Sequence, residues 1–290
     1  MTGLAVRRPG LQTTIQDLGR PGHADVGVTT GGACDRVALR LANRLVGNPD
    51  SAAGLECLLG GVELEATVPA TVAVTGAPAP ARVNGSPVDG PVVRLAAGDR
   101  LSLGEPVRGL RCYLAVGGGI EAPRLFGSCG SSPTAGLGPS PLVAGDVLRV
   151  GAAPAYDRDV PDASDRGRWA DPEVVVALVL GPRTDWFDAA SVDRLTHTAW
   201  TVTSDLDRVG IRLAGPDLVR TRHVELPSEG IVRGAVQVPP SGQPIVFLAD
   251  HPTTGGYPVI GVVVDADTDR LAQVRPGDRV RFTRRSPGWR

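Results

Sequence analysis

The segment from residue 225 to residue 258 holds the side chains best suited to chemistry in this sequence of 290 residues. Two carboxylates, Glu229 and Asp250, are candidates for acid–base catalysis. Candidates for orienting a substrate surround the apolar stretch 244–249, namely Gln237, Gln243, Thr253, Thr254 and Tyr257. Interspersed glycines allow a ligand to approach closely, and prolines fix the path of the backbone. The segment therefore predicts a polar site on a rigid β scaffold.

The sequence does not indicate a covalent nucleophile. His251 is a further candidate base, although a histidine between Asp and Pro in a turn is more often an exposed polar residue. No serine lies in a Gly-x-Ser-x-Gly pattern. Lysine is absent, so all 30 basic residues are arginine, which excludes a Schiff-base lysine, a Walker A lysine and a biotin-bearing lysine within these residues. We expect amide or carboxyl chemistry that depends on positioning and electrostatics.

Two pairs of charged residues outside that segment are candidates for binding an anion. Asp17 and Arg20 stand beside a Gly-Pro turn, where a guanidinium fork suits a carboxylate or carboxamide substrate. The slightly favoured alternative is an internal Asp–Arg pair that ties a loop. Arg208 and Arg212 flank Gly210 and are suited to neutralise a phosphate, a carboxylate or a carboxybiotin, or else are exposed arginines on an edge strand.

Two acidic residues admit a functional and a structural interpretation. Asp35 follows two glycines, as in an anion cradle at a helix start, but a plain helix cap is favoured. Glu56 is a candidate general base, although a surface acid is commoner.

The elements that position these residues are predicted to be mainly β-strands with a few helices. Many glycines and prolines indicate short strands and turns, among them Gly-Asp turns at 97–101, 144–148 and 276–280 and an Asn-Gly hairpin at 84–85. Helices are expected over 36–46, from 48 to 56, and over 185–198. The length favours two domains, 1–151 and 173–290, joined by a linker of Ala, Pro, Asp and Arg at 152–172.

Composition limits the classes of partner and compartment. A formal net charge of -1 argues against a nucleic-acid binder. The absence of a long apolar run argues against a membrane span, and the absence of a leader segment favours a cytoplasmic location. The four cysteines form no Cys-x-x-Cys pair and lack histidines at ligand spacing, so we expect buried thiols and no metal.

Several motifs together resemble the allophanate hydrolase subunit 2, or KipA-like, family of biotin-dependent carboxyltransferases. This family includes the C subunit of bacterial 5-oxoprolinases and part of urea carboxylases. The motifs are 9–22, 38–49, Leu55-Glu56 with 59–61, 113–116, Gly181-Pro182 with 185–187, 208–213 and most of 225–257. The resemblance implies two cyclophilin-like β-barrel domains. It also implies a subunit 1 (KipI-like) partner, with a third LamB/YcsF-like subunit in the oxoprolinases.

Departures from the family pattern bear on specificity. Cys129 stands in Gly127-Ser-Cys-Gly-Ser131 where the family usually has arginine. His251-Pro252 replaces the usual Arg-Gln, and Pro252 removes a donor amide.

Three functions are compatible with the resemblance. The first is a subunit of an ATP-dependent amide hydrolase complex that acts on a small-molecule amide, most simply 5-oxoproline. The second is carboxyl transfer, with biotin carried by another chain because this one has no lysine. The third is a KipA-type regulatory protein that antagonises a kinase inhibitor.

Overall fold

The structure, a computed structural model, describes residues 3–152 and 173–286 of the chain. The chain divides into two compact units, of which unit 1 comprises 1–21 and 31–169, and unit 2 comprises 22–30 and 170–290. The predicted linker at 152–172 lies, apart from Ala152, outside the described residues. The segment 22–30, which includes a short 3-10 helix at Ala24–Val26, groups with the second unit.

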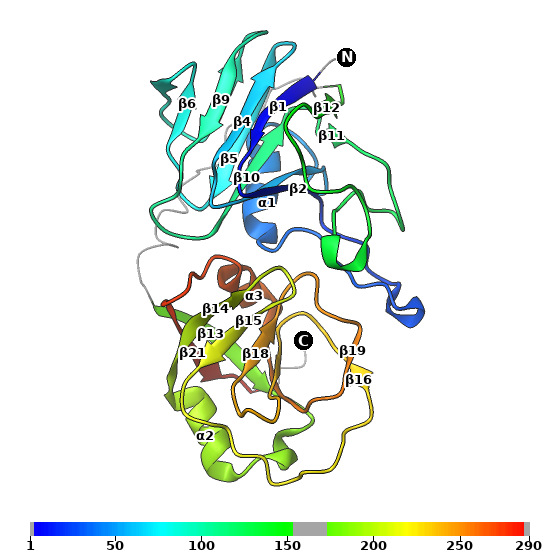
Figure 1. The fold of residues 1–290 in the computed structure, drawn as a ribbon, viewed down its shortest axis with the longest axis vertical. Coiled ribbons are helices and arrows are strands. Elements are labelled where there is room, and N and C mark those ends of the chain that lie inside the picture. The colour runs from blue at the N-terminus through cyan, green and yellow to red at the C-terminus, as the bar shows by residue number, and fades with distance from the viewer. Residues whose placement is uncertain (1–2, 153–172, 287–290) are drawn as a thin grey trace. The chain divides into compact units, whose positions relative to one another are not determined.

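Unit 1 is built from two antiparallel sheets (Figure 1). The larger sheet has seven strands in the order β11 (Ile120–Glu121), β12 (Val147–Val150), β1 (Gly3–Pro9), β4 (Val62–Ala66), β9 (Arg100–Leu103), β6 (Ala81–Val83) and β7 (Ser86–Pro87). The smaller sheet has five strands in the order β2 (Gln12–Gln16), β3 (Gly54–Leu58), β10 (Arg111–Val116), β5 (Ala70–Gly76) and β8 (Val92–Leu95). A continuous apolar core from both sheets, including Val6, Leu55 and Leu64, holds this unit together.

Unit 2 is a closed seven-stranded barrel. Its strands follow the order β13 (Glu173–Leu180), β20 (Val259–Val263), β17 (Ala235–Gln237), β18 (Ile245–Phe247), β15 (Gly210–Ala214), β14 (Ala199–Leu206) and β21 (Arg279–Arg284). Strand β21 pairs in parallel with β13 and antiparallel with β14. A small ribbon of β16 (Glu229–Gly230) and β19 (Thr254–Gly255) and the helix α3 (Asp265–Leu271) complete the unit. The mainly β fold class is thus confirmed, with a closed barrel in unit 2 and two sheets in unit 1.

The predicted turns are present and share one chemistry. Strands β9, β12 and β21 each follow a Gly-Asp turn whose glycine has a positive φ. In each turn the aspartate carboxylate accepts a hydrogen bond from the backbone N–H three residues earlier, at 2.7 to 2.8 Å. The Asn84-Gly85 hairpin joins β6 to β7 with both central residues at positive φ, as a type I′ turn requires.

The helix predicted over 36–46 is α1 (Arg36–Leu45). The side chain of Asp35 caps it by accepting a hydrogen bond from the N–H of Ala38 at 3.0 Å, which confirms the structural interpretation of that residue. Gly47 follows with φ 76, which ends the helix.

The helix predicted from 48 to 56 is wrong. Residues 54–58 form β3, which is paired on both sides, with β2 and β10. Asn48 does not cap a helix, because its side-chain N–H₂ donates to the carbonyl of Val116 and its oxygen accepts from the N–H of Gly118, both at 2.8 Å. The tertiary pairing of a central strand therefore outweighs the local capping signal.

The helix predicted over 185–198 is interrupted. A 3-10 helix at Thr184–Trp186 precedes α2 (Ala189–His197), and Asp188 caps α2 through the N–H of Ser191 at 2.6 Å. Phe187 forms an isolated β-bridge with Arg220, which holds the break between the two helices. A further 3-10 turn lies at Pro133–Ala135.

The four cysteines are free and buried, as predicted. No helix in the described parts of the chain is long and apolar enough to cross a membrane.

Candidate functional site

Asp17 and Arg20 follow strand β2 in unit 1, and both hold the loop at 128–130. The Asp17 carboxylate accepts hydrogen bonds from the Ser128 hydroxyl at 2.6 Å and from the N–H of Cys129 at 2.9 Å. The Arg20 guanidinium donates to the carbonyl of Gly130 and, at 3.5 Å, to Ser128 Oγ. Among the described residues the two side chains form no ion pair with each other. The structural alternative predicted that an Asp–Arg pair ties a loop. Asp17 and Arg20 do hold one loop, but each does so through its own hydrogen bonds and not as a pair.

Arg20 is a buried charge with unsatisfied donors. The residue is 1% exposed, and its Nε and Nη1 have no hydrogen-bond partner among the described residues. Unpaired acceptor and hydroxyl atoms lie in the same stretch of the fold, on Gln16, Ser131 and Ser132. Buried polar groups are nearly always hydrogen-bonded in proteins, so several unpaired atoms on two neighbouring segments indicate a place for a ligand.

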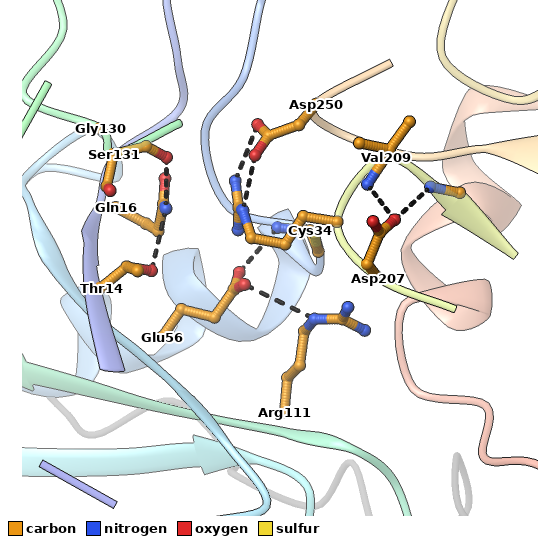
Figure 2. A network of polar contacts seen from close by, with 12 residues as sticks. Thr14, Gln16, Cys34, Glu56, Arg111, Gly130, Ser131, Asp207, Val209 and Asp250 are labelled. Carbon is orange, nitrogen blue, oxygen red and sulfur yellow. Dashed lines mark hydrogen bonds and ion pairs between the residues drawn. The ribbon is translucent and has the colours of Figure 1, made fainter. Parts of the chain in front are cut away.

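The side-chain amide of Gln16 lies beside Gly130 and Ser131. Its side-chain N–H₂ donates to Thr14 Oγ1 at 3.0 Å and to the carbonyl of Ser131 at 2.8 Å (Figure 2). Its Oε1 would lie 3.1 Å from a Cβ atom placed on Gly130, so any side chain at position 130 would crowd the Gln16 amide. We call Gln16, Arg20, Gly130, Ser131 and Ser132 the Arg20 cluster.

Cys129, which stands in the place of a usual arginine, is not an activated thiol. Its Sγ lies 3.5 Å from a carboxylate oxygen of Asp17. Burial, and after it the negative charge of Asp17, raise the pKa of the Cys129 thiol. The thiol therefore stays protonated, and it does not supply the positive charge of the arginine usual at this position.

Glu56 is buried, which corrects the expectation of a surface acid. Its Oε2 accepts from the N–H of Cys34 at 2.9 Å, and its Oε1 lies 3.5 Å from Arg111 Nε (Figure 2). The same Oε2 accepts from the Tyr113 hydroxyl at 2.6 Å. The Tyr113 hydroxyl in turn accepts from the N–H of Asp35 at 2.8 Å. Burial, reinforced by the charge of Glu56, raises the pKa of Tyr113 well above its usual value. Glu56 thus positions the start of α1.

Arg208 and Asp250 form a buried ion pair in unit 2. Arg208 Nε lies 2.9 Å and its Nη2 3.2 Å from the two oxygens of Asp250 (Figure 2). The side chains are 7% and 1% exposed. The predicted catalytic carboxylate and the predicted anion-binding arginine therefore neutralise each other, so Arg208 is not the exposed edge-strand residue of the structural alternative.

Glu229, the other predicted catalytic residue, is partly exposed and paired with Arg183. Both carboxylate oxygens accept hydrogen bonds from that guanidinium, one of them at 3.0 Å. The hydrogen bond from Arg183, which outweighs partial burial, lowers the pKa of Glu229. Glu229 is therefore ionised at neutral pH and is the more accessible of the two carboxylates.

The predicted orienting residues divide into two groups. Gln237 is buried and donates to the carbonyl of Tyr257 at 2.8 Å, while Thr254 pairs with Gly230 in the β16–β19 ribbon. The Thr253 carbonyl accepts a hydrogen bond from the N–H of Ile231, across the ribbon, at 2.9 Å. Tyr257 is 45% exposed. Together they frame the ribbon that carries Glu229.

Two predicted substrate-binding residues lie away from that ribbon. Arg212 is exposed on β15 and lies 4.0 Å from Asp205. Gln243 braces a separate loop, accepting from the N–H of Gly215 at 2.9 Å and donating to Asp217 Oδ1 at 2.5 Å.

His251 is buried, which corrects the expectation of an exposed residue. It is 7% exposed, and its Nδ1 lies 2.8 Å from the carbonyl of Pro252. Burial is the main cause that lowers the pKa of His251. The imidazole is therefore neutral at physiological pH.

Sequence reasoning missed Arg183 and the serines of the Arg20 cluster. Arg183 lies between Gly181-Pro182 and Asp185, inside a motif that otherwise contributes only to the family resemblance. Its position directly after a Gly-Pro turn was the available signal. The serines carried no signal, because nothing in the sequence brings 131–132 beside residue 16.

Residues 26–284 match the family described as carboxyltransferase domain, subdomain A and B. The chain belongs to this family. It is 40% identical to the C subunit of 5-oxoprolinase from Escherichia coli over 96% of its own length and 90% of the relative. It is also 35% identical to the C subunit of 5-oxoprolinase from Haemophilus influenzae, over 93% of this chain and 87% of that one.

Solved structures agree with this family. The urea amidolyase of K. lactis superposes with a TM-score of 0.89 at 28% identity, over 97% of this chain and 18% of that one. The protein TTHA0988 gives a TM-score of 0.87 at 34% identity, over 98% of this chain and 56% of that one. This chain thus corresponds to a part of each of those larger proteins.

Proposed function

We propose that this chain is a subunit of an amide hydrolase complex of the 5-oxoprolinase kind. The proposal is supported by similarity to the C subunit of 5-oxoprolinases over nearly the whole length of both proteins. The single structural observation that carries it is Arg20, a buried guanidinium with two unpaired nitrogens beside unpaired groups of Gln16 and two serines.

The Arg20 cluster is complementary to an amide. An amide presents a carbonyl acceptor and, when a hydrogen remains on nitrogen, an N–H donor. In the proposed complex the Arg20 N–H groups donate to the carbonyl oxygen and stabilise the negative charge that develops when it is attacked. Gln16 Oε1 accepts the amide N–H. Because these atoms are buried, the loop at 126–132 must move to admit the substrate.

In unit 2 we assign the two predicted catalytic carboxylates different parts. Glu229 is the accessible one and is proposed as the acid–base group of unit 2, with Arg183 setting its position. Asp250 holds Arg208 in place and acts as a positioning residue. Gln237, Thr253, Thr254 and Tyr257 are proposed to orient a ligand beside Glu229 within unit 2.

The remaining parts of the proposed reaction come from other chains. We propose a subunit 1 (KipI-like) partner and a third LamB/YcsF-like subunit, with ATP acting at the level of the complex. ATP would supply the phosphoryl group that activates the carbonyl. This chain contains no lysine for a P-loop, so we assign it the handling of the amide.

Reconstitution tests this function. The purified chain is mixed with a subunit 1 protein and a LamB/YcsF-like protein, and ATP-dependent release of glutamate from 5-oxoproline is measured. Arg20→Met is expected to lower the rate about tenfold to a hundredfold, the loss of one or two charge-assisted hydrogen bonds. Arg124→Met is the matched control, because Arg124 lies on the same loop but is exposed. Unchanged turnover in the Arg20 variant would contradict the assigned role.

Carboxyl transfer is the second candidate, favoured by the family match and by the likeness to urea amidolyase. In that case biotin would be carried on another protein, because this chain has no lysine to bear it. Glutamate release that avidin does not inhibit would support the hydrolase. Avidin-sensitive incorporation of bicarbonate into urea would support transfer instead.

A further inference from the structure

Unit 2 contains a cavity with polar and apolar walls that the functions assigned above do not use. Its volume is about 330 Å³, and it is lined by residues 217–220, His223 and residues 240–242. Asp217 and Arg220 carry its charges, while Leu218, Val219 and Pro240 give it an apolar wall. We call it the Arg220 cavity.

Arg220 is held in this cavity by stacking and has no counter-ion among the described residues. Its guanidinium carbon lies 5.8 Å from the centroid of the Trp186 ring, so the indole supports one face of the planar group. Arg222 lies at 5.9 Å over the same ring and pairs with Asp185 at 2.7 Å. Arg220, by contrast, takes part in no ion pair within the part of the chain that the structure describes. Arg220 and Arg222 both lie over the Trp186 ring, and of the two only Arg222 has a carboxylate partner among the described residues.

Unpaired donors accompany the unpaired charge. The Nε of Arg220 is buried without an acceptor among the described residues, and so is the indole Nε1 of Trp186. Leaving a buried donor without a hydrogen bond is unfavourable, and a bound acceptor would remove that cost. Trp186 is 4% exposed, so its indole N–H is a sensitive reporter of what happens beside Arg220.

The frame of the cavity is held in shape before any ligand binds. Gln243 bridges Gly215 and Asp217, and the N–H of Leu218 donates to the carbonyl of Gly242 at 3.0 Å. Gly242 has φ 75, and a Cβ atom there would lie 3.1 Å from the Cβ of Asp217. The loop therefore requires glycine at position 242. The side-chain amide of Gln243 is needed for the hydrogen bonds that hold the loop.

We propose that the Arg220 cavity binds the carboxylate group of a small organic acid, with Arg220 as the anchor. The edge of a guanidinium forms paired hydrogen bonds with a planar carboxylate. The apolar wall of Leu218, Val219 and Pro240 suits the hydrocarbon body of such an acid. Asp217 lines the same space and repels a doubly charged phosphate, so a monoanion is favoured. This inference does not depend on the amide hydrolase function.

Binding is tested on the full chain by following its tryptophan indole N–H signals in a ¹H–¹⁵N correlation spectrum. A Trp186→Phe variant assigns the reporter signal. The probes are cyclopentanecarboxylate, the uncharged cyclopentanecarboxamide of the same shape, and inorganic phosphate. We expect millimolar cyclopentanecarboxylate to shift the Trp186 signal in a saturable way, and the other two compounds to leave it in place. No saturable shift with the carboxylate, or an equal response to the carboxamide or to phosphate, would overturn the proposal.

Substitution at Arg220 gives the second part of the test. Arg220→Gln is expected to weaken cyclopentanecarboxylate about tenfold or more, and Arg212→Gln, an exposed arginine on the same barrel, is expected to have no effect. Folding is monitored by the signal of Trp200, whose Nε1 donates to the Leu195 carbonyl at 3.0 Å inside the barrel. Should Arg220→Gln lose that signal, Arg220→Lys keeps the charge without the fork and is expected to bind with intermediate affinity. Wild-type affinity in a folded Arg220 variant would refute the assignment.

Discussion

Arg20 in unit 1 and Arg208 in unit 2 are both buried arginines, but their surroundings differ. Arg208 meets Asp250 through two hydrogen bonds, so its charge is neutralised within the protein. Arg20 is 1% exposed and meets only a carbonyl and a hydroxyl among the described residues, with two nitrogens left over. Burial alone therefore does not separate a structural arginine from one that is proposed to bind a ligand. The partner of the guanidinium does.

This difference has an energetic meaning. Removing one partner of a complete buried ion pair leaves the other charge buried and unpaired, which is strongly destabilising. A guanidinium without a counter-ion already carries part of that cost in the free protein, and an anionic or polar ligand would relieve it. Substitutions at the two sites should therefore separate stability from activity.

The largest effect on stability is expected from Asp250→Asn. This change leaves the Arg208 charge buried without its carboxylate, and we expect a loss of about 3–5 kcal/mol in the free energy of unfolding. Urea titration followed by circular dichroism measures it. Asp205→Asn is the control, because Asp205 is 74% exposed and lies 4.0 Å from Arg212. Equal stability of the two variants would show that the buried pair does not stabilise unit 2.

Arg20→Met is expected to lower activity strongly and stability only slightly. Because Arg20 has no ion pair to lose among the described residues, the free energy of unfolding should fall by less than in Asp250→Asn, by about 1–2 kcal/mol. Activity of the reconstituted complex should fall far more than stability suggests. A loss of stability as large as that of Asp250→Asn would place Arg20 with the structural arginines.

A smaller effect is expected at the half-exposed pair of Glu229 and Arg183. Glu229→Gln should cost no more than about 1 kcal/mol of unfolding free energy at neutral pH, as for other solvent-accessible pairs. Since the pair lowers the pKa of Glu229 in the folded state, its contribution is present above the unfolded pKa of about 4.3 and is lost as the pH falls through the folded pKa. The difference between wild type and variant in urea midpoint should therefore shrink in acid. A difference that stays constant with pH would count against this ion pair.

The smallest effect is expected at His251. Burial lowers its pKa in the folded state, so the unfolded chain binds the proton more tightly. Stability should be full above the unfolded pKa of about 6.5 and should decline as the pH falls toward the folded pKa. His251→Gln is expected to flatten the dependence of melting temperature on pH in this range. An unaltered slope in His251→Gln would refute the prediction.

The sequence predicted the elements whose signals are local. The capped helix α1, the Asn-Gly hairpin and the three Gly-Asp turns each depend on residues a few positions apart, and all are present. The helix predicted from 48 to 56 failed because β3 is specified by its pairing with β2 and β10, which no local pattern reveals.

The site shows the same division. Polar residue types could be recognised along 225–257, but partners could not, because Asp250 meets Arg208 across 42 positions and Glu229 meets Arg183 across 46. Glu56 and His251 were expected at the surface on the basis of residue type. Their burial follows from a central strand and a closed barrel, which are properties of the assembled chain.

The parallel pairing of β13 with β21 has a consequence for synthesis on the ribosome. The first strand of the barrel is made about a hundred residues before the strand that closes it. Until Arg279–Arg284 has left the exit tunnel, β13 and β14 each present an open edge that can pair with another nascent chain. The barrel therefore closes only after Arg279–Arg284 has been made, and a chain that stops before residue 279 is expected to aggregate rather than to fold as a smaller barrel.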